Sequence, residues 1–204
     1  MARLKTKWNQ ADRKRTPKEI AGVIGFNLWV IAGESCLFLE NEGFETQTHS
    51  QRLDVIAEFI AFGAHVADRM VFDEMTATER EQFINALGQH LADTLQSNRE
   101  DASEPGEYRK DFINLLNDRM GEYSDCGYTE ENGPSFSMRC IAGKHVQTVM
   151  GDKDNKWIPD YVIDSEIPKL LLALKRVFKG QSPSLSEADF APPPIPESGV
   201  WGEE

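Results

Sequence analysis

The chain has 204 residues, of which 40% are hydrophobic and 27% are charged, so it is long enough to form one soluble globular domain with a substantial core. Its formal net charge of −12 disfavours nucleic acid or an anionic membrane as the main partner. Three cysteines without Cys-x-x-Cys spacing indicate neither a disulfide framework nor a thiolate zinc site, and they fit a reducing, cytoplasmic location best.

The charge is concentrated at one end. Residues 1–18 carry seven basic side chains and one acidic side chain, a net +6, which leaves −18 for the rest. We predict that residues 1–16 form a basic arm that is solvated or rests on the acidic body of a neighbouring subunit. The apolar run at 20–33 resembles a secretory signal, but it continues past Glu34 without a cleavage site and is too short to span a bilayer. We therefore expect no membrane insertion.

The first two helices are predicted from their start signals. Thr16-Pro17-Lys18-Glu19 is a capping box with Pro at the first helical position, and it predicts a helix from about Pro17 to Asn41. This helix is apolar on nearly all sides, which is typical of a central helix. A weaker box, Thr48-His49-Ser50-Gln51, predicts a second helix that reaches about Asp73.

The next two helices have equally clear signals. The capping box Thr76-Ala77-Thr78-Glu79 opens a predicted helix to about Ser97, and the stretch NREDASEPGE then breaks the pattern. Apolar residues recur at helical spacing after the break. They are Tyr108, Phe112, Leu115, Leu116, Met120 and Tyr123.

The last third of the chain is less uniform. Residues 135–141 fit either a strand or a helix, and we favour a helix that continues to Met150. The stretch WIPDYVID (157–164) reads as a turn or short irregular piece. A clear amphipathic helix follows from Ile167 to Gly180, with basic side chains near its negative end.

These elements predict an all-α, single-domain bundle of about six helices with a central apolar first helix. The helical domain covers 17–181, between the basic arm (1–16) and a Pro-rich, acidic tail (182–204). The apolar residues of the tail could anchor on a protein partner. No nucleotide-binding loop or hydrolase motif is present in the sequence.

One repeated pattern suggests metal chemistry. Gly-x-His-x-Ala-Asp occurs twice, ending at Asp68 and at Asp93. If the second and third helices form an antiparallel hairpin, a cluster that could bind Zn, Fe or Mn becomes sterically feasible. Its members are Glu58, His65, His90 and Asp93. A helical wheel instead places His65 about 150° from the apolar centre of its helix, on a polar face that something else must cover.

A second hypothesis starts from polar residues inside apolar stripes. Asn27 and Glu34 interrupt the first helix, and His145 interrupts the stripe at 138–149. A buried carboxylate needs a partner. The candidate partners of Glu34 are His145, Arg119 and Arg139. A pocket lined by Trp29, Glu34 and His145 could bind a small molecule or do acid–base work, and the alternative is a structural pair in the core or at a subunit contact.

The leading functional hypothesis is a non-enzymatic cytosolic protein that works by protein association, as a homodimer. The apolar first helix, the charged arm and the anchors in the tail favour it, and no recognisable catalytic set competes with it. Two alternatives stay open: a metal-dependent helical-bundle enzyme that uses the cluster above, and a small-molecule binding module that uses the Glu34 pocket.

Overall fold

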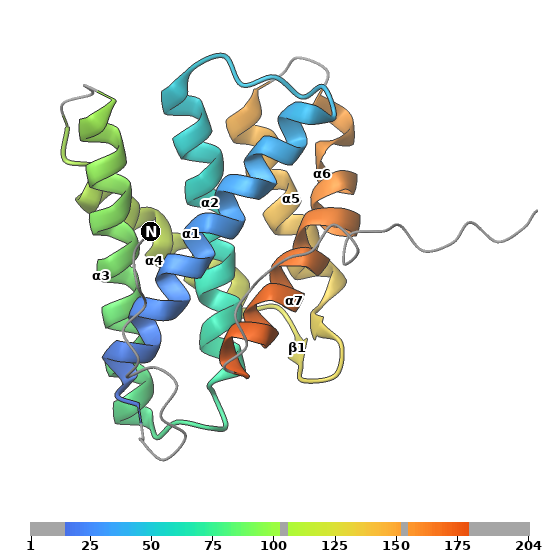
Figure 1. Ribbon diagram of the computed structural model, residues 1–204. Coiled ribbons are helices and arrows are strands. Elements are labelled where there is room, and N and C mark those ends of the chain that lie inside the picture. Colours follow the sequence, from blue (N-terminus) through green and yellow to red (C-terminus); the bar gives the residue numbers. More distant parts are fainter. Residues whose placement is uncertain (1–14, 103–105, 152–154, 180–204) are drawn as a thin grey trace, which may run out of the picture.

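A computed structural model describes residues 15–102, 106–151 and 155–179. The described chain is an all-α bundle, as predicted (Figure 1). Its long helices are α1 (Pro17–Asn41), α2 (His49–Met70), α3 (Ala77–Asp101), α4 (Tyr108–Ser124), α5 (Phe136–Met150) and α7 (Ile167–Phe178). Nearly all of the predicted basic arm and the whole predicted tail lie outside the described residues.

The predicted helix starts are confirmed. The backbone N–H of Glu19 donates to the Thr16 hydroxyl, and the Glu19 carboxylate accepts from the Thr16 backbone, which completes the capping box. The box at Thr76 and Glu79 is formed in the same way. These caps satisfy backbone donors that a helix leaves without partners, and they fix where α1 and α3 begin.

The segment at 135–150 is helical, as favoured, but two features between α4 and α7 differ from the predictions. A short antiparallel hairpin, β1 (Tyr128–Thr129) with β2 (Gly133–Pro134), lies in the loop before α5. The stretch predicted as irregular is a helical turn at Asn155–Trp157, then α6 (Ile158–Tyr161), then a π-helical turn at Val162–Glu166 that runs into α7.

Pro168 explains why this stretch is helical but not regular. A proline inside a helix lacks the N–H that would bond four residues back, and its ring clashes with that carbonyl. The wider π turn immediately before α7 lets the chain continue as a helix through Pro168. The proline was therefore a sign of altered helix geometry rather than of a loop.

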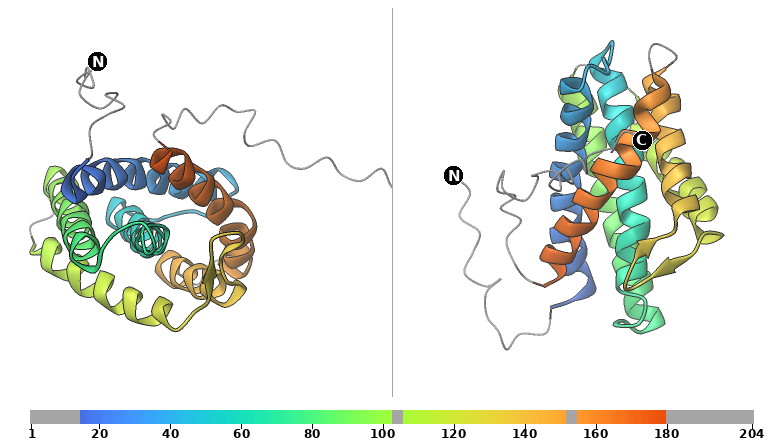
Figure 2. Two further views of the ribbon diagram at one scale, coloured as in Figure 1. Left: turned by 90° about the horizontal axis from the view of Figure 1, so that it is seen from below. Right: turned by 90° about the vertical axis from the view of Figure 1, so that its right-hand side faces the viewer.

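Helix α2 occupies the middle of the bundle. Figure 2 shows it surrounded by the other helices, and it packs against α1, α3, α4, α5 and α7. Nearly every residue from Leu53 to Asp68 is buried. Helix α1 is apolar but only half buried, because it packs on α2, α3 and α7 and leaves its fourth side outward. The helix enclosed on all sides is therefore α2 rather than α1.

Candidate functional site

The polar side of α2 is buried, which corrects the expectation from the helical wheel. His65, Glu58 and Asp68 are each less than 5% exposed, because α4, α5 and α3 cover the side opposite the apolar centre. The wheel assumed that one side of the helix faces water. That assumption fails for a helix packed on five neighbours.

Both buried carboxylates of α2 are neutralised by arginines from covering helices. Arg119 of α4 donates two hydrogen bonds of 2.7 Å to the two oxygens of Glu58. Arg80 of α3 donates to both oxygens of Asp68, at 2.7 and 2.5 Å. Such bidentate ion pairs satisfy a buried charge and fix the register of the helices that supply them.

His65 lies on the same side of α2 as Glu58 and Asp68 but joins neither of their ion pairs. Its ring packs against Tyr123 of α4 at a centroid distance of 5.5 Å. Neither ring nitrogen of His65 nor the Tyr123 hydroxyl has a hydrogen-bond partner among the described residues. Burial is the main reason that the pKa of His65 falls from 6.5 to about 4, with Arg69 contributing further. His65 is therefore a neutral core residue at pH 7.

The four residues of the predicted metal cluster do not come together. Glu58 binds Arg119, and His65 packs on Tyr123. His90 lies at the contact of α3 with α1, where a Cβ placed on Gly25 would be 2.4 Å from its Cδ2 atom. Asp93 is exposed and accepts from Arg109 at 2.5 Å. Within 15–102, 106–151 and 155–179, no three His, Cys, Asp or Glu side chains are placed to hold one metal ion.

The three residues of the predicted ligand pocket are also separated. Glu34 is exposed on α1, whereas Trp29 is partly buried against the core. His145 of α5 lies 2.5 Å from Glu122 of α4, on the other side of α2 (Figure 2). The buried polar residue of α1 is Asn27 instead, whose side-chain amide donates to the Val23 carbonyl at 2.7 Å.

The partners expected for Glu34 are used elsewhere. Arg119 binds Glu58, and His145 lies against Glu122. Arg139, in the first turn of α5, has its guanidinium over the Phe136 ring. Glu34 thus lies in water, although its neighbours in the sequence stripe are apolar, because this side of α1 faces outward.

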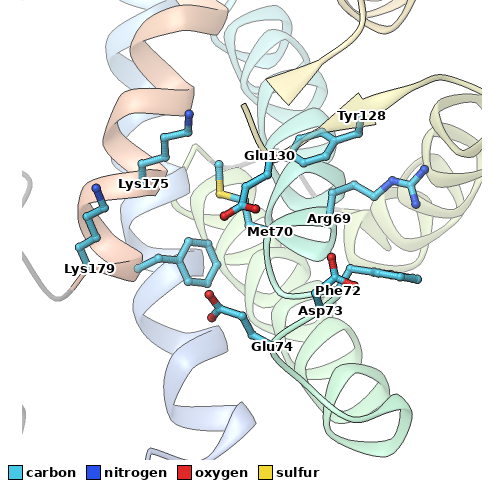
Figure 3. Close-up of a pocket in the computed structure, with 10 residues that line it drawn as sticks. Arg69, Met70, Phe72, Asp73, Glu74, Tyr128, Glu130, Lys175 and Lys179 are labelled. Carbon is cyan, nitrogen blue, oxygen red and sulfur yellow. The ribbon is translucent and has the colours of Figure 1, made fainter. Parts of the chain in front are cut away.

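A groove of about 610 Å³ lies between the end of α2 and α7 (Figure 3). Its charged side chains are three cations and three anions: Arg69, Lys175, Lys179, Asp73, Glu74 and Glu130. These charges balance, so the net charge of the lining selects neither an anion nor a cation. None of the candidate residues from the sequence lines it.

The most unusual surface of the bundle is the outward side of α1. We define the α1 outer face as Gly22, Phe26, Val30, Gly33 and Leu37. Phe26 is 64% exposed, Leu37 56% and Val30 42%. At 100° per residue the five positions fall within about 80° of one another, so they form one continuous stripe along the helix. Large apolar side chains gathered in one exposed stripe mark an interaction surface.

By length and composition, α1 is the helix in the described part of the chain that could cross a membrane. Half of its most apolar window is buried inside the bundle, and both a core helix of a soluble protein and a signal sequence near the N-terminus have this length and composition. The apolar residues of the outer face are visible in the sequence, where we interpreted them as a sign of a central helix. A helix that is apolar all round has an apolar side left over when only three neighbours pack on it.

No protein-family model, curated protein or solved structure gives a significant match to this chain.

Proposed function

We propose that this protein is a non-enzymatic cytosolic protein that works by association, as a homodimer held together by the α1 outer face. The observation that carries the proposal is the exposure of Phe26, Val30 and Leu37 in one stripe. Burial of apolar surface stabilises a complex by roughly 25 cal/mol per Å², so a face of this kind favours being covered.

The rest of the described chain supports association over catalysis. The buried ionisable groups of α2 are used in structural pairs, with Arg119 on Glu58 and Arg80 on Asp68. All three cysteines are free thiols, which fits a reducing compartment. The net charge of −12 keeps nucleic acid an unsuitable partner.

Size-exclusion chromatography with multi-angle light scattering tests the proposal. The full chain should elute with about twice its mass of 23.0 kDa at micromolar concentration. Forms that lack residues 1–16 or 182–204 test whether either terminal segment covers the face in place of a second copy. A strict monomer for the full chain and for both shortened forms would overturn the proposal.

A further inference from the structure

We infer that two copies pair their α1 helices antiparallel about a two-fold axis near residues 29 and 30, so that the glycines of one helix receive the large side chains of the other. The inference rests on the proposed homodimer and specifies its geometry. It would make the interface isologous, with the same stripe used by both copies.

Glycine content is the first observation. A glycine in a helix interior costs about 1 kcal/mol relative to alanine, so it needs a packing reason. Inside the bundle such reasons exist: a Cβ on Gly63 would lie 2.4 Å from the Leu28 Cδ2 atom. Gly22 and Gly33 of α1, like Gly121 of α4, have none in the described bundle, since a Cβ on any of them would meet no atom within 4 Å. Gly22 and Gly33 differ from Gly121 because they lie in one stripe with the exposed Phe26, Val30 and Leu37. A second helix that approaches closely would supply the missing reason.

Spacing is the second observation. In an antiparallel pair with a two-fold axis between residues 29 and 30, facing positions have numbers that add to 59 or 60. Gly22 then faces Leu37 of the second copy, and Phe26 faces Gly33. Val30 lies next to the axis and faces its own counterpart. Phe26 and Leu37 each meet a glycine, which is how well-packed facing layers alternate, and the smaller Val30 meets its own counterpart at the axis.

Charge complementarity is the third observation, and it selects the antiparallel direction. The N-terminal end of α1 carries the exposed Lys18 and follows residues 1–16, whose six basic side chains and one acidic side chain give a net +5. The C-terminal end carries the exposed Glu42 and has no basic residue in its last turn, whereas Glu40 is already paired with Arg52 of α2. Glu42 lies at the negative end of the helix dipole, where an acidic side chain is unfavourable. An antiparallel partner places the positive end of one copy against the negative end of the other, twice.

The same stripe makes a second copy the best occupant. A parallel pair would set Glu42 beside Glu42 and Phe26 beside Phe26, so charges and bulky groups would both oppose it. A membrane would accept Phe26 and Leu37 but would not require glycines at the positions that face them, and the overall negative charge disfavours an anionic lipid surface. The outer face complements itself in shape, and the opposite charges at the two ends of α1 complement each other in an antiparallel pair.

Single-cysteine crosslinking tests the register. The background carries Cys126→Ser and Cys140→Ser and keeps Cys36, which is buried and whose pKa is raised to about 12 by burial and by Glu40. In the inferred register, the Val30 positions of the two copies are offset by about 1.5 Å along the helices. The two Phe26 positions are about 10 Å apart along the axis and the two Leu37 positions about 22 Å, beyond the Cα separation that a disulfide spans.

Val30→Cys should therefore form a covalent dimer under mild oxidation, and Phe26→Cys and Leu37→Cys should not. If the protein is a dimer by light scattering but Phe26→Cys or Leu37→Cys crosslinks as fast as Val30→Cys, the register is wrong while the homodimer stands. If it is a dimer and none of the three crosslinks, the interface lies elsewhere. If the full chain and both shortened forms are all monomeric, the proposed function itself fails.

An exchange of large and small residues gives a second test that does not depend on oxidation. Gly33→Leu fills the space that Phe26 of the second copy would occupy. It should weaken dimerisation roughly tenfold or more, without unfolding the monomer. Adding Phe26→Ala should restore most of the affinity, because the large and small groups then face each other in reverse. The matched control is Gly121→Leu on α4, which also has open space and should leave dimerisation unchanged. Absence of rescue would overturn the register.

Discussion

Glu58 is a carboxylate that is 3% exposed, and its burial depends on one guanidinium. Replacing Arg119 by Met leaves that charge in the core without its partner, so the free energy of unfolding should fall by about 3–5 kcal/mol. Urea denaturation measures the loss. The control is Arg109→Met, which removes an ion pair with Asp93 that is more than half exposed and should cost less than about 1 kcal/mol. Equal losses for the two variants would contradict a structural role for the buried pair.

His65 gives the fold a pH dependence whose sign follows from its environment. Its folded pKa is about 4 and its unfolded value is 6.5, so the unfolded chain binds more protons between these values. Stability contributed by keeping the ring neutral is present above pH 6.5 and is lost as the pH falls toward 4. The slope is at most about 1.4 kcal/mol for each pH unit in that window.

The variant His65→Leu should remove this part of the pH dependence. Urea denaturation of both proteins at pH 7, 5.5 and 4 should show the wild type losing stability faster than the variant. Because the His65 nitrogens and the Tyr123 hydroxyl have no partner in the described core, the variant should also be no less stable at pH 7. Parallel pH profiles would contradict this account of His65.

These residues also show why the site was hard to predict. The spacing of Glu58 and His65 is visible in the sequence, but their burial depends on Arg119 and Tyr123, sixty residues away, packing against them. A helical wheel contains no information about how many neighbours a helix has. Conversely, Asp93 was grouped with Glu58 and His65 by its spacing, and it lies exposed on α3.

Helices α1 and α2 cross closely at Gly63, which is an element-scale requirement. A Cβ at this position would lie 2.4 Å from the Cδ2 atom of Leu28 and 3.5 Å from the Cδ1 atom of Leu170. Gly63→Ala should therefore force α2 away from its neighbours and lower the free energy of unfolding by about 1–3 kcal/mol. The control Gly121→Ala, in open space on α4, should raise it by up to about 1 kcal/mol. The same sign for both changes would contradict the close crossing.

The elements themselves were largely predictable, because their signals are local. Thr16 with Glu19, and Thr76 with Glu79, form caps that need only a few neighbouring residues. The prediction of an irregular stretch at 157–164 was wrong, because the geometry of this segment depends on Pro168 and on packing against α5. The central position of α2 was likewise missed, since α1 is the more apolar helix. The apolarity of a helix indicates how favourable its burial would be, not how much of its surface the monomer buries.

At the scale of the whole molecule, the opposed charges of the N-terminal segment and the body should contribute to association. Residues 1–14 carry five basic side chains and one acidic side chain, so deleting them removes +4 of the net +6 of residues 1–18. We expect the dimer dissociation constant to rise and its dependence on salt to decrease, because screening acts on the charges that were removed. Sedimentation at 0.05 and 0.5 M NaCl measures both effects. An unchanged dissociation constant with an unchanged salt dependence would show that the segment has no part in association.

The central claim is that the α1 outer face holds the homodimer, and sedimentation equilibrium of two matched variants tests it most directly. Phe26 and Phe136 are almost equally exposed, at 64% and 65%, but only Phe26 lies on the outer face. Phe26→Lys should sediment as a folded monomer of about 23.0 kDa, whereas Phe136→Lys and the unchanged protein should sediment with twice that mass. A dimer that survives Phe26→Lys, or an unchanged protein that is monomeric throughout, would contradict the account.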